Sequence, residues 1–299
     1  MSLYDGVDLR LNVPHSARMY DYFLGGFTNF AADREAAGHV LAIAPWVRAA
    51  ARANRSFVHR STRALALAGI DQFLDIGTGI PTSPNLHEVA QSVEPRARVV
   101  YADNDPIVLT HAQALLAGTP EGRTAYIEAD VTDPAGLLAA PGLRDTIDFS
   151  RPVALSLNAL LHFVPDAHGA YELVEHLKSA LAPGSALVMT HLTVEFAPEE
   201  MGRVVGIYQA AGTALQARTR VEFARFFDGW TLLSPGIVPA PHWRPTADDP
   251  AVSGSDASGY AGVALRPTSA SPGPRPAGRS RSPSRPPSPP AGPPERTNR

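Results

Sequence analysis

A short apolar run that ends in an acid and two glycines constrains this chain more than any other segment. It reads Gln-Phe-Leu-Asp-Ile-Gly-Thr-Gly over 72–79, and a second apolar run, Val-Val-Tyr-Ala-Asp-Asn-Asp, follows over 99–105. The glycines stand where a buried strand would pass into a loop, so the backbone there can approach a ligand closely. A glycine turn followed by an acid at the end of the next strand is how nucleotide-binding α/β folds hold phosphates or ribose hydroxyls. The sequence therefore predicts a nucleotide-binding sheet.

Apolar segments alternate with helix-start signals from residue 71 onward. Ser83, Asp105 and Asp133 each precede a proline, the pattern of an N-cap followed by a first-turn proline. Further helices are expected over 166–181 and 198–217. Strands that alternate with helices form a mostly parallel sheet covered on both faces. We expect a Rossmann-like α/β fold with a seven-stranded sheet, whose strands are 71–76, 98–102, 123–128, 153–158, 186–191, 230–238 and 260–265.

About 70 residues of helical pattern come before the glycine loop. A short helix is expected from Ser16, as N-cap, to the glycine pair that begins at Gly25. A longer one, with small and apolar residues at spacings of three and four, is expected to close at Gly69. We therefore expect a helical cap or lid over 1–69 and an α/β domain over 70–266.

The last segment, 267–299, is rich in proline, serine, glycine and arginine. It has almost no large apolar residue, so it is predicted to be a disordered tail. Six of its residues are arginine and one is acidic, so the rest of the chain is more acidic than the net charge of −3 indicates. An acidic body is not typical of a nucleic-acid-binding protein, and we expect no nucleic-acid partner.

Composition argues against several other classes. No run of 18 apolar residues is present, so no membrane span is expected, and the N-terminus lacks the pattern of a secretion signal. The chain has no cysteine, which excludes disulfides and thiolate catalysis and is compatible with a cytoplasmic protein. Its ten histidines are scattered with no His-x-x-x-His pair, so no metal site is predicted.

The acids at the strand ends divide into two groups. Asp105 and Asp133 directly precede prolines and are expected to cap helices. Asp103 and Asp130 come earlier, at the carboxyl ends of their strands, where ligands bind in open α/β sheets. We expect Asp103 to bind a ribose and Asp130 a base amino group. Asp75 lies inside its strand end, where a carboxylate needs hydrogen bonds, and the glycine-loop amides are its expected partners.

The pattern resembles that of class I S-adenosylmethionine-dependent methyltransferases. Asp75-Ile-Gly77-Thr-Gly79 matches their acid-x-Gly-x-Gly signature, Asp103 their ribose acid, and Asp130-Val131 their adenine-contacting pair. The segment from Leu161 to Asp166, Leu-His-Phe-Val-Pro-Asp, resembles the Leu-His-His-x-Pro-Asp element of small-molecule methyltransferases.

More closely, the chain resembles a bacterial methyltransferase family, the DUF574 group, over about residues 10–265. One departure from the general methyltransferase loop is Pro81, which stands where a third glycine is usual. It would restrict how the methionine end of the cofactor can approach the loop. A second is the last strand, which continues as Gly-Val-Ala-Leu from Gly262 where Gly-Val-Gly is common. The segments that carry the resemblance are 16–26, 29–35, 52–55, 73–82, 225–229 and 241–245.

The resemblance implies S-adenosyl-L-methionine as cofactor and in-line transfer of its methyl group, with a small molecule as the acceptor. Loop 77–79 would face the methionine portion together with Asn158, while Asn104 would help to frame the adenine. A lid that includes Tyr20 would cover the cofactor, and Arg18 or Arg55 would pair with its carboxylate. The cofactor-binding residues implied are Asp75, Gly77, Thr78, Gly79, Asp103, Asn104, Asp130, Val131, Asn158, Arg18 and Tyr20.

Three candidate site residues have an equally good structural role. His162 and His191 are candidate catalytic bases, because histidine titrates near neutral pH, but both also fit packed, hydrogen-bonded core positions. Arg18 equally fits a helix-surface ion pair with Asp21 or Asp33.

Two other functions remain open at this point. Gly77, Gly79 and Thr82 approximate the dinucleotide fingerprint, so an NAD(P)-dependent oxidoreductase is an alternative. Threonine at the third position and Asp75 before the loop fit that fingerprint poorly. The other alternative is a regulator that binds S-adenosylmethionine without turnover.

Overall fold

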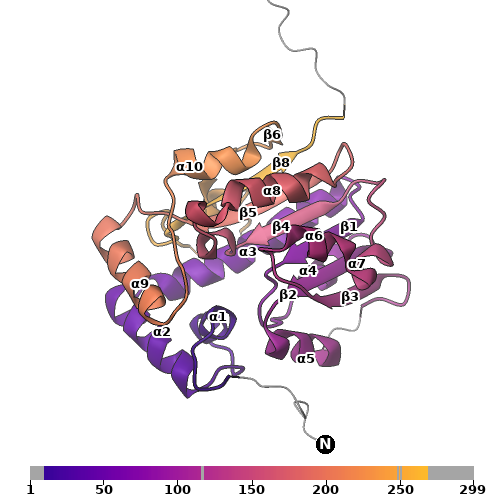
Figure 1. Cartoon of the computed structure of the whole chain (residues 1–299). Helices are drawn as coiled ribbons and strands as arrows, with labels where there is room; N and C mark the ends of the chain where they lie inside the picture. Colours follow the sequence, from indigo (N-terminus) through magenta and orange to yellow (C-terminus); the bar gives the residue numbers. More distant parts are fainter. Residues whose placement is uncertain (1–9, 116–117, 248, 250, 269–299) are drawn as a thin grey trace, which may run out of the picture. The chain divides into compact units, whose positions relative to one another are not determined.

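A single mixed sheet organises the computed structural model, which describes residues 10–115, 118–247, 249 and 251–268 (Figure 1). Within these residues eight strands are ordered β3-β2-β1-β4-β5-β8-β6, and β7 also pairs with β8. Strands β1 to β5 are parallel and β8 runs antiparallel to β5. The strands are β1 (Gln72–Ile76), β2 (Arg98–Asp103), β3 (Arg123–Glu128), β4 (Ala154–Asn158), β5 (Ala186–Leu192), β6 (Thr231–Leu232), β7 (Val238–Pro239) and β8 (Gly259–Leu265).

The predicted fold class is confirmed, but the strand count of seven is wrong by one. The expected single strand 230–238 is two short strands on the same edge of β8, with Thr231 opposite Leu265 and Val238 opposite Ala261. Gly236 interrupts them in a left-handed conformation (φ 86°), and its N–H donates to the carbonyl of Leu233 at 2.7 Å. A turn at this point prevents continuous pairing.

Alternating side chains of the strands fill a core on each face of the sheet. Phe73 and its neighbours pack against α3 (Val47–Leu67) and α4 (Leu86–Gln91). Leu74 belongs to the opposite core, with α6 (Pro134–Ala139), α7 (Pro141–Arg144), α8 (Ala170–Ser179) and α10 (Arg220–Ala224). Helix α5 (Pro106–Leu115) contacts β2 and β3.

A third hydrophobic cluster lies apart from the two sheet cores. It joins α1 (Ser16–Leu24), α2 (Ala31–Ile43) and the start of α3 to α9 (Pro198–Ala210). Helices α2 and α9 contact each other and lie side by side in Figure 1. The N-terminal helices and the much later helix α9 thus form one apolar cluster beside the sheet. The cluster includes Met19, Phe23, Val40, Ala51, Val204 and Tyr208.

The helix caps follow the sequence in part. Asp105 accepts the N–H of Ile107 at 2.9 Å and Asp133 that of Gly136 at 3.0 Å, as expected of N-caps. Helix α4 does not begin at Ser83: Asn85 is its N-cap and pairs with Glu88 in a capping box. The capping box is the stronger start signal because it satisfies two helix-end N–H groups at once. The N-cap of α1 is likewise His15, one residue before the expected Ser16.

Helix α9 ends at Ala210, short of the expected 217. Gly212 adopts a left-handed conformation (φ 80°), and the N–H of Thr213 donates back to the carbonyl of Tyr208 at 2.9 Å, which closes the helix. Residues 213–219 continue without helical structure. Among the described residues no helix is both long and apolar enough to cross a membrane. The expected disordered tail lies outside the described residues from 269 onward.

Candidate functional site

The carboxyl edge of the sheet holds a cavity around the point where the strand order reverses. β1 lies between β2 and β4, so the chain leaves it in one direction and later returns on the other side. Such a switch point opens a crevice outside the strand ends. The cavity has an empty volume of about 1470 Å³, which includes space open to solvent. Its lining from the sheet edge includes Asp75, Gly77, Thr78, Gly79, Asp103, Asn104, Val131, Asn158, Ala159, Thr190, His191, Gly259 and Tyr260.

The glycine loop bends sharply over the end of β2. Gly77 and Gly79 both have left-handed backbones (φ 71° and 68°), which glycine adopts without strain. A Cβ on Gly77 would come within 2.6 Å of a Leu160 side-chain carbon, whereas one on Gly79 would have no described atom within 4 Å. The loop therefore packs on one side and leaves Gly79 open on the other.

The glycine-loop amides are not the partners of the Asp75 carboxylate, contrary to the expectation from the sequence. The N–H groups of Gly77 and Thr78 point to the carbonyl of Ala102 at 2.8 and 3.4 Å, and that of Gly79 donates to the Asp103 carboxylate at 2.8 Å. The loop amides are thus taken by acceptors on β2, the Ala102 carbonyl and the Asp103 carboxylate, and not by the Asp75 side chain of β1. Asp103 consequently fixes the loop as well as facing the cavity.

The pKa of Asp75 is raised to about 7, mainly by burial; the Arg55 charge opposes this rise and the Asp103 carboxyl adds to it. A carboxyl that titrates near neutral pH inside a cavity is typical of a functional group rather than of a packing residue. Burial also raises the pKa of Asp103, against the backbone N–H groups of Asp105 and Gly79, which lower it.

Of the three residues expected on the adenine side, two line the cavity and one does not. Asn104 and Val131 line the cavity. Asp130 is exposed and is not part of the lining; its carboxylate accepts from the backbone and hydroxyl of Thr132 at 2.8 and 2.7 Å. The amide of Asn104 donates to the other Asp130 oxygen at 3.4 Å.

Asn158, at the end of β4, presents a buried amide to the cavity. Neither its Nδ2 nor its Oδ1 has a hydrogen-bond partner among the described residues. Buried amides are normally paired, so these atoms indicate a place for a polar ligand. Ala159, the next residue, has a left-handed backbone (φ 50°).

A chain of hydrogen bonds ties this strained turn to the N-terminal helices. The N–H of Ala159 donates to the Thr190 hydroxyl at 2.8 Å, which donates to the Asn54 amide oxygen at 2.7 Å. The Asn54 amide nitrogen donates to the Tyr20 hydroxyl at 2.8 Å, and this hydroxyl donates to the carbonyl of Ala51 at 3.0 Å. All five residues line the cavity. Sequence reasoning identified Tyr20 but missed Asn54 and Thr190.

Arg18 does not reach the cavity. Its side chain is buried, donates to the carbonyl of Val13 at 2.8 Å and lies 3.3 Å from the Asp33 carboxylate. Of the two roles open to it, the structure places it in the ion pair with Asp33. Arg55 does line the cavity, and its Nη2 donates to the carbonyls of Thr82 and Pro84 at 2.6 and 2.9 Å. Pro81 is not part of the lining.

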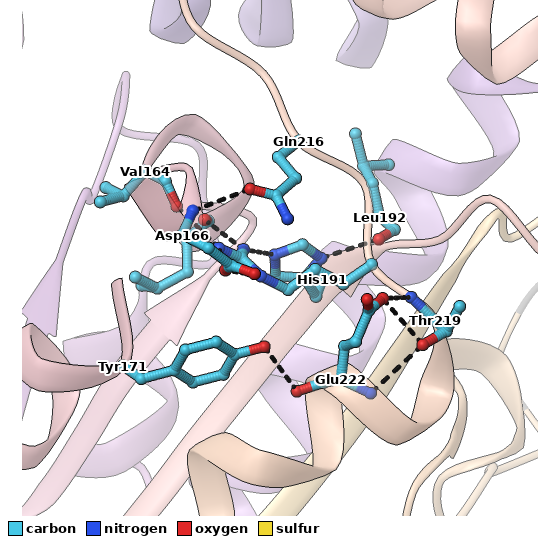
Figure 2. Close-up of polar contacts among 10 residues, drawn as sticks. Val164, Asp166, Tyr171, His191, Leu192, Gln216, Thr219 and Glu222 are labelled. Carbon is cyan, nitrogen blue, oxygen red and sulfur yellow. Dashed lines mark hydrogen bonds and ion pairs between the residues drawn. The ribbon is translucent and has the colours of Figure 1, made fainter. Parts of the chain in front are cut away.

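His191 lines the cavity but both of its ring nitrogens are engaged (Figure 2). Arg218 donates from Nη1 to Nε2 of His191 at 2.6 Å, so Nδ1 carries the proton and donates to the carbonyl of Leu192 at 2.7 Å. Burial, with the nearby Arg218 charge, lowers the pKa of His191 to about 3. A neutral ring whose acceptor nitrogen is occupied has no lone pair for a substrate proton. The structure therefore assigns His191 the packed, hydrogen-bonded role.

Arg218 was missed in the sequence, yet it organises this side of the site. The side chain is fully buried and bonds Asp166 at 2.6 Å and the carbonyls of Leu161 and Val164, both at 2.9 Å. Gln216 adds a bond from its N–H to the carbonyl of His162 at 2.8 Å. Together they hold segment 161–166 against the end of β5. The sequence placed Gln216 within a helix expected to end at 217, which concealed its role.

His162 differs from His191 in having an unused nitrogen. The ring is buried, lines the cavity and lies 5.6 Å from the His191 ring, centroid to centroid. Its Nδ1 has no hydrogen-bond partner among the described residues. Burial, with the neighbouring His191 and Arg218, lowers the pKa of His162 well below its usual range. It is therefore a neutral ring that can exchange a hydrogen bond with a ligand.

Known proteins of similar sequence share this fold. A family model described as S-adenosyl methyltransferase matches residues 5–267. The solved structure of a DUF574 family protein from Streptomyces avermitilis is 50% identical, with a TM-score of 0.85 and coverage of 87% of this chain and all of the other. A Thermobifida fusca structure is 42% identical, with a TM-score of 0.80 and coverage of 87% and 97%. No curated protein matches this chain.

Proposed function

The chain belongs to the S-adenosyl methyltransferase family and is an S-adenosylmethionine-dependent methyltransferase, and we propose that it transfers the methyl group in line to a small-molecule acceptor in the cavity described above. The observation that carries this proposal is the Asn158 amide, buried in the cavity with no partner among the described residues. It marks a polar subsite at the switch point of the sheet, between the ends of β1 and β4. The family and its cofactor argue against the oxidoreductase alternative.

The residues around the switch point fit the two ends of the cofactor. Each carboxylate oxygen of Asp103 accepts one backbone N–H and keeps a further lone pair, which suits a ribose hydroxyl. Asn104 and Val131 would frame the adenine, and Asp130 would contribute by holding the Asn104 amide.

The methionine end would meet groups of complementary charge. Asp75 would hold the ammonium and the open face of Gly79 would leave room for the chain. Arg55 would take the carboxylate in place of Arg18, since Arg55 lines the cavity. The Asn158 amide would form hydrogen bonds with the remaining polar atoms of the methionine portion.

When bound, the cofactor supplies a methyl group already activated by its sulfonium. The protein's own task is then to align the acceptor with that carbon and to exclude water. Two features of the chain support such alignment. The hydrogen-bond chain from Ala159 to Tyr20 fixes helices α1 and α3 against the sheet edge. The 161–166 segment, held by Arg218, closes the cavity beside the end of β5.

The small-molecule part of the proposal is tested by dividing a bacterial cell extract into a low-mass and a macromolecular fraction. Each is incubated with the protein and S-adenosylmethionine, and formation of S-adenosylhomocysteine is measured, with the Asp103→Asn variant as control. We expect the low-mass fraction to support turnover by the native protein only. Turnover with the macromolecular fraction alone would contradict the proposal, and none with either fraction would favour a non-catalytic binding protein.

A further inference from the structure

One wall of the cavity has a different character from the rest. Five of its residues, here called the aromatic wall, belong to the third hydrophobic cluster and come from α1, α3, α9, β5 and the turn after β4. The rings of Phe163 and Tyr208 lie 5.7 Å apart, tilted by 51°. The two rings are inclined to each other, and each offers an apolar face or edge against which another ring can pack. The aromatic wall consists of Phe23, Val47, Phe163, Leu192 and Tyr208.

Charge is distributed unevenly around the cavity. The carboxylate, arginine and histidine side chains in the lining are His15, Arg55, Asp75, Asp103, His162 and His191. His15 pairs with Asp105 at 3.0 Å, and Asp75 and Asp103 belong to the ends of β1 and β2, the half of the cavity assigned above to the cofactor. Among the described residues no carboxylate, lysine or arginine belongs to the aromatic wall. A charged acceptor placed there would lose its hydration without gaining a partner.

One polar ring adjoins this wall. The ring of His162 packs on that of Phe163 with centroids 4.3 Å apart, and its Nδ1 has no hydrogen-bond partner among the described residues. Arg218 and Gln216 hold the backbone on either side of this ring through the carbonyls of Leu161, His162 and Val164. A single neutral ring with a nitrogen that can accept or donate one hydrogen bond, beside an apolar surface, suits a ligand with one hydroxyl group.

We propose that the aromatic wall is the subsite for the methyl acceptor, and that it takes an uncharged, flat, largely apolar molecule whose nucleophile is a hydroxyl oxygen oriented by His162. This inference rests on the proposed function. The new bond joins the acceptor oxygen to the methyl carbon while the carbon–sulfur bond breaks and its electron pair stays on sulfur. The neutral His162 ring orients the hydroxyl through a hydrogen bond, and the hydroxyl proton is released to water as the new bond forms.

The test uses the full chain saturated with S-adenosylhomocysteine and three probes of similar size, titrated by calorimetry. The probes are 2-naphthol, which is neutral, 2-naphthoate, an anion, and phenethylammonium, a cation. We expect 2-naphthol to bind at least about tenfold more tightly than either ion. Equal or tighter binding of an ion, or no binding of 2-naphthol up to about 1 mM, would overturn the assignment while leaving the cofactor site intact.

Two phenylalanine variants locate the probe. Phe163→Ala is expected to weaken 2-naphthol binding at least about tenfold, whereas Phe27→Ala, at a side chain 98% exposed, should leave it unchanged. Both variants are first titrated with S-adenosylhomocysteine, which reports folding and the cofactor site. If Phe163→Ala keeps both affinities, the aromatic wall is not the subsite. If the native protein itself fails to bind S-adenosylhomocysteine, the proposed function fails first and this inference fails with it.

Discussion

Arg218 donates a hydrogen bond from its guanidinium to Nε2 of His191 at 2.6 Å, deep in the protein. A guanidinium stays protonated in proteins, so the imidazole must be the acceptor and must be neutral. A histidine at the end of a strand that lines a cavity would otherwise be the first candidate for a general base. This one is a structural element that joins β5 to the segment carrying His162.

Replacing Arg218 with methionine should destabilise the fold by about 3 kcal/mol, because it leaves two buried carbonyls and the His191 nitrogen without a donor. Urea denaturation measures the change. Arg203→Met is the matched control: that side chain is 60% exposed and its carboxylate partner is 3.9 Å away, so the effect should stay within about 0.5 kcal/mol. Equal effects of the two variants would refute the buried-network role of Arg218.

Asp103→Asn should weaken S-adenosylhomocysteine binding by at least about tenfold, since the carboxylate both holds the Gly79 N–H and faces the cavity. Calorimetric titration gives the dissociation constant directly. Asp133→Asn makes the same chemical change at a helix cap outside the cavity and should have little effect, because asparagine also caps helices. A similar loss in both variants would mean that the effect is not local to the site.

Cofactor binding should become tighter as pH rises through about 7, the pKa to which burial raises Asp75. An ammonium group favours the ionised carboxylate, so below that pH binding must first remove a proton from Asp75. Titrations of S-adenosylhomocysteine at several pH values test this. The Asp75→Asn variant should bind more weakly and lose this pH dependence; a native profile that is flat or falls across this range would contradict the ammonium-binding role.

The raised pKa of Asp75 also affects the stability of the folded protein when no ligand is bound. Because the folded-state pKa lies above the ordinary value of 3.8, the ionised form is disfavoured by folding, and stability is lost as pH rises from near that value to about 7. Asp75→Asn removes this penalty. Relative to the native protein, the variant should therefore be more stable in urea at about pH 8 than at about pH 4. A difference of the opposite sign would show that Asp75 is ionised and stabilised in the empty cavity.

Thr190→Val should destabilise the protein by about 1–3 kcal/mol, because it leaves the Ala159 N–H without its acceptor and the Asn54 amide oxygen without its donor. The change is nearly isosteric, so packing is largely kept. Thr268→Val, at an exposed position, is the matched control and should be close to neutral. Denaturation midpoints of the two variants that coincide with the native one would show that this hydrogen-bond chain contributes nothing to stability.

The parts of the site that the sequence predicted depend on local rules. The loop at Gly77 and Gly79 and the strand-end acid Asp103 follow from strand periodicity, and parallel strand ends meet at one edge wherever the sheet forms. The same rule placed Asn158 at that edge, but it could not show that the Asn158 amide is left unpaired while Thr190 on the neighbouring strand is paired. That distinction depends on Asn54, 136 residues away in sequence from its partner Thr190.

The residues that were missed, or that remained ambiguous, act over long sequence distances. Arg18 could pair with Asp21, one helical turn away, or with Asp33, and the chosen partner depends on how α1 meets α2. Gln216 was hidden because the helical pattern of α9 was extended past the left-handed Gly212 to 217, and no local pattern marked Arg218. Only the folded chain brings residues 213–219 back across the 161–166 segment.

A crystal structure of the full chain with S-adenosylhomocysteine tests the proposed cofactor site directly. We expect the ribose to lie against Asp103 and the adenine beside Asn104 and Val131. The amino acid portion should reach Asp75, Arg55 and Asn158, with its sulfur facing the aromatic wall. A ligand bound outside this cavity, or one bound in the reverse direction with its adenine against Phe163 and Tyr208, would refute this cofactor site.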